Sequence, residues 1–303
     1  MNEKIYLGVD TSVLLSNFEF KNVSELLELD EIQGNTLIKQ ENVKSPDNMY
    51  RIVTKYGNSF IINGDSTIIL YNSLLNSIGS YKINNILSNY SDFSIFNTTV
   101  EFNDQFSDLP INPYFFGYLL RLRNRRFIRF NINLKETILS SVKRMKFRYF
   151  IFIDYILVII SNKASKSLKK NDSIPNIFKK NSISNRQQLA AGMIDSDSEN
   201  GIGNKFIEIK NIMNKKLFKD FYYVFSSIGI NLTSRYNSKD KWIINLFGSD
   251  NLSKIPLVSK NYSIDKASLN HFKIIKINVK EAILLEITKN RMYSIVTNDF
   301  FML

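Results

Sequence analysis

The chain has 303 residues, and 44% of them are hydrophobic, so it can bury the core of one large domain or of two ordinary ones. It contains no cysteine and a single histidine, His271, which excludes disulfides, thiolate metal sites, cysteine nucleophiles and histidine-rich metal cages. The formal net charge of +12 favours a polyanionic partner, and the alternative is a solvated lysine-rich surface.

The chain shows no targeting or membrane segment. Its N-terminal sequence, MNEKIYLGVDTSVLLSNFEF, lacks the basic and then apolar pattern of a signal peptide. The most apolar run, residues 149–160, is too short to span a bilayer and is interrupted by Asp154, so we expect a buried strand or helix there. We therefore expect a soluble intracellular protein. We also expect the single histidine, His271, to have a structural rather than a catalytic role.

Residues 1–105 predict β structure. The runs TSVLLSN, MYRIVTKYG, NSFIING and STIILYN are short, rich in β formers and separated by Gly, Asn and Asp turns, and a helical period occurs only around VSELLELDEI. Residues 251–303 follow the same pattern, with three or four strands after His271. One β domain formed by both chain ends and interrupted by an inserted domain, residues 106–250, accounts for this distribution.

The inserted block holds the positive charge. Residues 106–250 contain 25 Lys and Arg against 11 Asp and Glu, whereas the rest of the chain contains 15 against 17. Five arginines fall within nine residues, which favours nucleic acid over a lysine excess caused by AT-rich codons. These arginines are Arg121, Arg123, Arg125, Arg126 and Arg129.

The block contains two like successions of elements. Helices are expected around residues 111–124 and 185–200, and each has a glycine among apolar residues, Gly117 and Gly192. Each is followed by a strand, RRFIRFNIN or NKFIEIKN, and then by a second helix, LKETILSSVKRMKF or KLFKDFYYVFSSIGI. The polar segment 161–185 between the two successions is expected to be a linker or a long loop.

The two glycines predict that their helices pack closely. Ala191 and Gly192 have almost no side chain, so the backbone of the helix around Gly117 can approach them. The C-terminal tips would then meet and offer carboxylates to a shared divalent cation, and the second helix ends with Asp195 and Asp197. Oxygen ligands of this kind suit Mg²⁺ and the hydrolysis of a phosphodiester.

These segments resemble a known family. AAGMIDSDS resembles the signature of LAGLIDADG (DOD) homing endonucleases, and DSIPNIF, FSSIGI and LFGSDNLSKIPLVSKN resemble segments of its intein-borne members. The chain ends resemble the Hint (protein-splicing) domain of inteins on YLGVDTSVLLSNFEFKNVSELLELDEI, SFIINGDSTIIL and MYSIVTNDFFML. The resemblance implies an α+β fold: an all-β Hint-like domain, residues 1–105 and 251–303, interrupted by a two-repeat αββα endonuclease-like domain, residues 106–250. It also implies a monomer with internal pseudo-two-fold symmetry.

The splicing residues that the resemblance implies are replaced. The first nucleophile position falls on Tyr6, or on Gly8 if the alignment slips, and neither can perform an acyl shift. Asn63 and Ser66 stand where the family has Thr or Asn and then His. The closing His-Asn pair is replaced by Met302 and Leu303, so we expect splicing to be lost.

The implied nuclease site keeps one of its two acids. Asp197 occupies the catalytic and metal-binding position of the second helix and is followed by Ser198, whereas alignment on Gly117 places Leu122 at the partner position. A single carboxylate would bind Mg²⁺ weakly or not at all, so cleavage is expected to be impaired or lost. The alternative is that Asp195 and Asp197 are helix-end residues retained from an ancestor.

DNA binding can outlast cleavage. Alternation in RRFIRFNIN places arginines and asparagines on one face of a strand, where they suit phosphates and base edges, and in the resembled family a saddle-shaped sheet faces DNA. Any of the cations could instead be a solvated surface charge. The expected DNA-binding residues are Arg121, Arg123, Arg125, Phe127, Arg129, Asn131, Asn133, Lys205, Lys210, Arg235, Lys239 and Lys241.

Three functions remain open on the sequence. The leading hypothesis is an intein-derived LAGLIDADG homing-endonuclease-like protein that binds double-stranded DNA, with splicing lost and cleavage impaired or lost. An alternative is an active, metal-dependent and site-specific endonuclease or nickase with an asymmetric site. A second alternative is a structural or interaction subunit of a larger assembly that reuses the scaffold.

Overall fold

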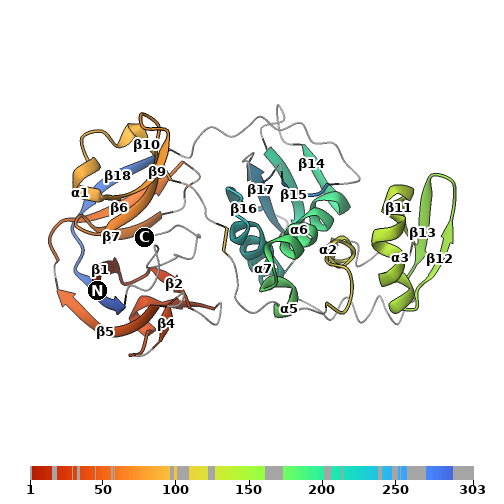
Figure 1. Ribbon diagram of the computed structural model, residues 1–303, viewed down its shortest axis with the longest axis horizontal. Coiled ribbons are helices and arrows are strands. Elements are labelled where there is room, and N and C mark those ends of the chain that lie inside the picture. The colour runs from red at the N-terminus through yellow and green to blue at the C-terminus, as the bar shows by residue number, and fades with distance from the viewer. Residues whose placement is uncertain are drawn as a thin grey trace. The chain divides into compact units, whose positions relative to one another are not determined.

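The structure is a computed structural model, in which the chain forms two compact units (Figure 1). The first unit is Met1–Thr98 with Ser268–Leu303, and the second is Thr99–Ala267. The fold is mixed α/β with antiparallel sheets and few helices. The described residues are 2–15, 19–28, 30–32, 35–44, 46–55, 57, 59–95, 99–100, 109–121, 127–160, 173–200, 206–212, 214–237, 241–247, 252, 254–257 and 271–288.

Both chain ends contribute strands to one seven-stranded sheet of the first unit, with the order β18-β6-β7-β1-β19-β5-β4. Strand β1 (Asn2–Gly8) lies between β7 (Ser59–Asn63) and β19 (Glu281–Thr288), and β18 (Phe272–Ile277) pairs with β6 (Met49–Thr54). Each of these three pairings is antiparallel, as is the pairing of β6 with β7. The C-terminal strands therefore complete a sheet that the N-terminal strands begin.

The rest of the first unit consists of short elements around the same core. Strands β8 (Thr67–Asn72), β9 (Ser77–Lys82) and β10 (Phe93–Ser94) form a three-stranded sheet, and β2 (Ser12–Leu14) pairs with β3 (Phe20–Asn22). Strands β5 (Asn35–Lys44) and β4 (Glu31–Ile32) belong to the seven-stranded sheet beyond β19, and the remaining elements are helix α1 (Ile83–Ile86) and the 3₁₀ turns η1 (Val23–Glu25) and η2 (Tyr90–Asp92).

The helical period around VSELLELDEI does not form a helix beyond the turn η1. The Asp30 carboxylate accepts hydrogen bonds from the Leu27 backbone N–H and from Lys21 Nζ, both at 2.8 Å. An aspartate that binds nearby backbone in this way competes with helical hydrogen bonds. The segment therefore turns between Leu27 and Asp30 before it enters β4, and its buried residues, Val23, Leu26 and Ile32, pack into the core of the first unit.

The second unit contains two like copies. The first copy comprises α2 (Pro113–Arg121), β11 (Phe127–Asn131), η3 (Ile132–Leu134), α3 (Lys135–Arg144), β12 (Arg148–Ile151) and β13 (Tyr155–Ile159). The second copy comprises α6 (Ile183–Asp197), β14 (Ser198–Asn200), β15 (Phe206–Ile212), α7 (Lys215–Ser227), β16 (Leu232–Asn237) and β17 (Lys241–Phe247). Their sheets share one order, β11-β13-β12 in the first and β15-β17-β16, with β14 added at the edge, in the second.

Each copy extends beyond the expected αββα pattern with a β-hairpin. In the first copy, residues 149–160 do not form one strand or helix, because a turn at Asp154 divides the run into β12 and β13. The Phe152 N–H donates to the Tyr155 carbonyl at 2.8 Å to close this turn. Only alternate residues of β13, Ile156 and Val158, are fully buried, which is the pattern of a sheet with one covered face.

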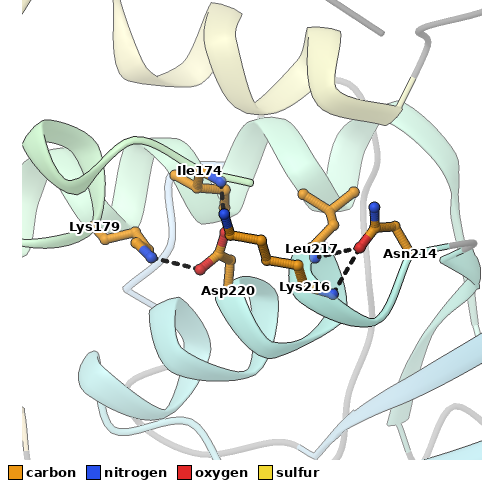
Figure 2. A network of polar contacts seen from close by, with 6 residues as sticks. All are labelled: Ile174, Lys179, Asn214, Lys216, Leu217 and Asp220. Carbon is orange, nitrogen blue, oxygen red and sulfur yellow. Dashed lines mark hydrogen bonds and ion pairs between the residues drawn. The ribbon is translucent and has the colours of Figure 1, made fainter. Parts of the chain in front are cut away.

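The segment expected to be a linker has an ordered end that packs into the core. Its described part includes helix α5 (Asn176–Lys179), and the Phe178 ring stacks on Phe116 with 4.2 Å between centroids. Figure 2 shows the buried Asp220 of α7, whose carboxylate accepts from the Ile174 N–H at 2.6 Å and from Lys179 Nζ at 2.5 Å. Asp220 therefore anchors this segment to α7, whose first turn is capped by the Asn214 side chain.

The sequence predicts residues 106–250 as the inserted block. The second unit of the structure is longer at both ends, Thr99–Ala267. Thr99 forms a β-bridge with Ile228, and Leu252 and Ile255 are buried in the core that the two copies share. Arg186 of α6 is fully buried, and its guanidinium donates to the Asn181, Ser227 and Val100 carbonyls. These contacts tie both ends of the inserted chain to α6 and α7.

The predicted contact between the two glycine-containing helices is confirmed. A Cβ atom built on Gly117 would meet the Leu189 carbonyl and lie 3.1 Å from the Met193 nitrogen, and one on Gly192 would meet the Tyr114 carbonyl and lie 2.7 Å from the Tyr118 nitrogen. Each glycine therefore faces the residue three before and the residue one after the other glycine. This reciprocity is the signature of a local two-fold axis between α2 and α6.

Replacing Gly192 with Ala should destabilise the second unit by about 2 kcal/mol or more, because the new methyl group meets backbone that cannot move aside. In an exposed helix the same change would stabilise by about 1 kcal/mol. The measurement is urea unfolding followed by fluorescence of Trp242, the single tryptophan, which stacks on Phe218 in this unit. Ser184→Ala, at an exposed position of the same helix, is the control, and a Gly192→Ala chain as stable as wild type would contradict the close contact.

Candidate nucleic-acid interface

The acids at the end of α6 occupy different environments. Asp195 is 2% exposed, and its Oδ2 accepts a hydrogen bond from the Tyr114 hydroxyl of α2 at 2.9 Å. It therefore links the two helices. Asp197 is the last residue of α6, and its side chain lies outside the described residues, as does Leu122 beyond the end of α2.

The metal-binding hypothesis stays a prediction. Among the residues that the structure describes, no three His, Asp or Glu side chains gather as metal ligands. The Leu122 side chain has no ligand atom, so of the two positions that the alignment pairs only Asp197 could supply a carboxylate, and Mg²⁺ prefers several hard oxygen ligands. The donor set of these positions therefore fits a two-metal site poorly.

The alternation predicted for the first strand is confirmed over β11. Phe127, Arg129 and Asn131 are exposed, whereas Ile128 and Phe130 are buried against the helices. The strand ends at Asn131, earlier than expected, because its side chain accepts the Asn133 N–H at 2.9 Å and starts the turn η3. Asn133 therefore lies in a turn rather than in the strand.

The outer face of the three-stranded sheet is richer in rings than the sequence indicated. Cross-strand partners bring together Phe127, Ile159 and Arg148 in one row, and Arg129, Leu157 and Phe150 in the next. Phe127 is 56% exposed and Phe150 54%. We call this surface the aromatic face and define it as Phe127, Arg129, Asn131, Arg148, Phe150, Tyr155, Leu157 and Ile159.

Sequence reasoning missed the contribution of β12 and β13 to this face. Reading 149–160 as one buried element hid Arg148, Phe150 and Tyr155 as surface residues. The signal that could have found them is Asp154, a turn former between two short runs of β-branched and aromatic residues. In the fold, the Arg129 guanidinium lies 4.9 Å from the centre of the Tyr155 ring, a cation–π contact between β11 and β13.

The outer face of the second copy holds a set of ion pairs beside a pair of rings, Phe206 and Phe247, whose centroids lie 5.7 Å apart. Glu208 of β15 is 8% exposed, and its carboxylate contacts Arg235 Nη2 at 2.7 Å and Lys210 Nζ at 3.1 Å. The strand register places Lys241 on this same face, since residues 241, 243 and 245 alternate with the buried Leu246 and Ile244 and Asn245 pairs with Glu208. Two of the expected DNA-binding cations are thus held by one carboxylate.

The remaining expected DNA-binding residues lie where side chains are not described. Arg121 is the last residue of α2, and its side chain lies outside the described residues. Arg123, Arg125, Lys205 and Lys239 lie outside them altogether.

The positions that the sequence resemblance aligns with splicing residues lie in ordinary structural settings where the structure describes them. Tyr6 is half-buried within β1 opposite Leu284, and a Cβ on Gly8 would lie 2.8 Å from Ile61 Cβ. Asn63 forms the turn after β7, since its Oδ1 accepts the Asp65 N–H and its Nδ2 donates to the Asp47 carbonyl.

Ser66 follows in the same turn and is 5% exposed. Met302 and Leu303 lie outside the described residues, and His271 is exposed just before β18. The serine hydroxyl cannot replace a histidine as a proton donor to a scissile amide.

Comparison with known proteins gives remote structural similarity only. No family model and no curated protein matches the chain. Structures of the homing endonuclease I-DmoI are similar: mesophilic variants cover 45% of this chain and 88% of theirs at 13% identity and a TM-score of 0.29. The structure of a variant of I-DmoI with its target DNA and Mn covers 45% of this chain and 86% of its own, at 13% identity and a TM-score of 0.30. The structure of I-DmoI with DNA and Mn covers 44% of this chain and 89% of its own, at 13% identity and a TM-score of 0.29.

None of the helices in the described part of the chain has the length and apolar character needed to cross a bilayer. Helix α6 contains a buried arginine, Arg186, and a buried aspartate, Asp195, and is a core helix of the second unit.

Replacing Glu208 with Gln should release Arg235 and Lys210 from a carboxylate while keeping the shape of the side chain. We expect the chain to elute from a heparin column at higher salt than the wild type, because two cations become available to the polyanion. Glu136→Gln, at an exposed site of α3, changes the formal charge equally and serves as the control. Equal elution of the two variants would mean that Glu208 does not restrain these cations.

Proposed function

We propose that this chain is an intein-derived, LAGLIDADG-type protein that binds double-stranded DNA as a monomer through the sheets of its second unit. The proposal rests on one observation above all: two like copies are joined by a reciprocal helix contact at Gly117 and Gly192. Two equivalent halves related by a local two-fold axis suit a duplex, whose two strands are themselves related by two-fold axes.

The charge distribution supports a nucleic-acid partner for this unit. Residues 106–250 hold an excess of 14 positive charges, from 25 Lys and Arg against 11 Asp and Glu. Arg129, Arg235 and Lys241 project from the outer faces of the sheets rather than towards the helices. Cations of this kind contact phosphates and position a protein on DNA, while asparagine and arginine can read base edges.

We further propose that splicing is lost and that cleavage is impaired or lost. Tyr6, Ser66, Met302 and Leu303 stand at the positions where the resembled family has its splicing residues, and none supplies the required chemistry. Leu122 removes one of the two acids of the nuclease site. Asp197 would hold any residual Mg²⁺.

Duplex binding is tested by fluorescence anisotropy of a labelled 30-base-pair DNA over a range of salt concentrations. Binding should weaken steeply as salt rises, and Arg129→Ala with Lys241→Ala should lower the magnitude of the log–log slope by about one for each phosphate contact removed. Lys143→Ala, an exposed lysine on the helix side of the first copy, is the control. A flat salt response with no effect of the substitutions would overturn the proposal.

The enzyme alternative has a separate test. Supercoiled plasmid incubated with the protein and Mg²⁺ should stay intact if cleavage is lost. If nicking occurs, Asp197→Asn should abolish it while Asp154→Asn, in an exposed turn, leaves it unchanged. Nicking that depends on Asp197 would replace the proposal of lost cleavage with that of an asymmetric nickase.

One observation favours the second alternative, an interaction subunit. Exposed apolar side chains gather on the hairpin of the first copy, where Ile153 is 92% exposed and Phe152 44%. Clusters of this kind often mark binding surfaces. DNA binding that is weak and independent of salt, together with a stable complex with an identified protein, would support this alternative.

A further inference from the structure

The two copies present chemically different outer faces. In the second copy, Glu208 holds Arg235 and Lys210 in ion pairs on the outer face. In the first copy, the aromatic face contains neither Asp nor Glu, because the strand sequences FIRFN, RYFI and YILVI have none. Two copies that share one strand order therefore offer different surfaces to a ligand.

The rings of the aromatic face are arranged as a platform. Phe127 and Phe150 are each more than half exposed, and they stand on opposite edge strands with Leu157 and Ile159 between them on β13. Register alone fixes this arrangement, since the alternate residues of the three strands point to the same side. The result is a flat apolar centre with exposed rings on both sides.

A row of planar groups continues this platform towards the hairpin turn. The Phe152 and Tyr155 rings are stacked, with centroids 4.5 Å apart and planes 19° apart. The Arg129 guanidinium lies over the Tyr155 ring at 4.9 Å. Flat groups in such a row can accept a further flat group, such as a nucleobase, at stacking distance.

Two arginines border the rings. Arg129 and Arg148 lie on opposite edge strands, and in the part of the chain that the structure describes neither guanidinium belongs to an ion pair. The nearest acid in the hairpin is Asp154, in the turn. Exposed rings bordered by available guanidinium groups are the combination that single-stranded nucleic acids use, with bases on the rings and phosphates on the cations.

We propose that the aromatic face of the first copy binds unpaired nucleotides of a nucleic-acid strand. Bases stack on Phe127 and Phe150, and Arg129 and Arg148 contact the phosphates. The bases of an intact duplex already stack on one another and cannot lie flat on these rings, so the surface selects an unpaired or opened strand. The inference rests on the proposed nucleic-acid function and assigns the unpaired part of the ligand to the first copy.

The net charge of the unit favours a nucleic acid over a protein as the occupant. A protein partner for this face would need an acidic and apolar surface. Its binding would tolerate an aliphatic side chain in place of an exposed ring. A stacking platform would not, because an aliphatic side chain of similar volume offers no π face. The difference between Phe and Leu at one exposed position therefore separates the two occupants.

The test compares anisotropy of a labelled 20-nucleotide oligothymidylate with that of a 20-base-pair duplex, using the full chain. Phe127→Leu with Phe150→Leu should weaken oligothymidylate binding by about 10-fold or more, because each stacked base contributes substantially to affinity. Duplex binding should change less than about three-fold. Leu75→Ala, at an apolar site that is 67% exposed in the first unit, is the matched control and should alter neither affinity.

The outcomes separate this inference from the proposed function. Duplex binding without oligothymidylate binding overturns the inference and leaves the proposed function standing, and loss of both overturns both. Oligothymidylate binding that survives the two Phe→Leu changes also overturns the inference, because it shows that rings are not needed. Unfolding followed by Trp242 fluorescence checks that the variant is folded, and a single Phe150→Leu change at its exposed site repeats the test if the pair is not.

Discussion

The second unit depends on the close approach of the α2 and α6 backbones at Gly117 and Gly192. Any side chain larger than hydrogen at either position would meet a carbonyl oxygen or an amide nitrogen of the other helix. Because each glycine faces the same two positions relative to the other, the contact relates the copies by a local two-fold axis. The hydrogen bond from Tyr114 to Asp195 strengthens the same junction with a polar contact in the core.

Around this junction, buried polar groups hold the beginning of the insertion and the segment between its two copies in place. Arg186 binds the Val100 and Ser227 carbonyls, and Asp220 binds the Ile174 N–H and Lys179. Buried charges are costly unless they are satisfied by such partners, so each makes the arrangement of chain around it specific. These contacts fix the chain of the inserted unit at Val100, at the segment around Ile174 and along α7.

The outer faces of the two sheets have diverged while the strand order has stayed the same. Glu208 draws two cations into ion pairs in the second copy, whereas Arg129 and Arg148 stand among exposed rings in the first. A pseudo-symmetric scaffold can therefore present one face on which a carboxylate holds the cations and one face without Asp or Glu. The duplex binding proposed for the unit rests on the local two-fold axis, whereas the binding of unpaired nucleotides inferred for the first copy rests on its own outer face.

The basic middle, the two glycine-containing helices and the alternation of β11 could be predicted from the amino-acid sequence, because charge, glycine and strand period are local properties. That Asp197 and Leu122 are unequal partners of one site is a prediction from alignment, and it stays a prediction because both side chains lie outside the described residues. Only the tertiary structure decided that residues 149–160 form a hairpin, that α5 belongs to the core, and that Glu208 restrains Arg235. These features depend on contacts between residues far apart in the chain, such as β15 with β16 and α5 with α7. The physical reason is that a local pattern fixes which face of an element is apolar, whereas the partner that covers or neutralises that face is fixed by packing.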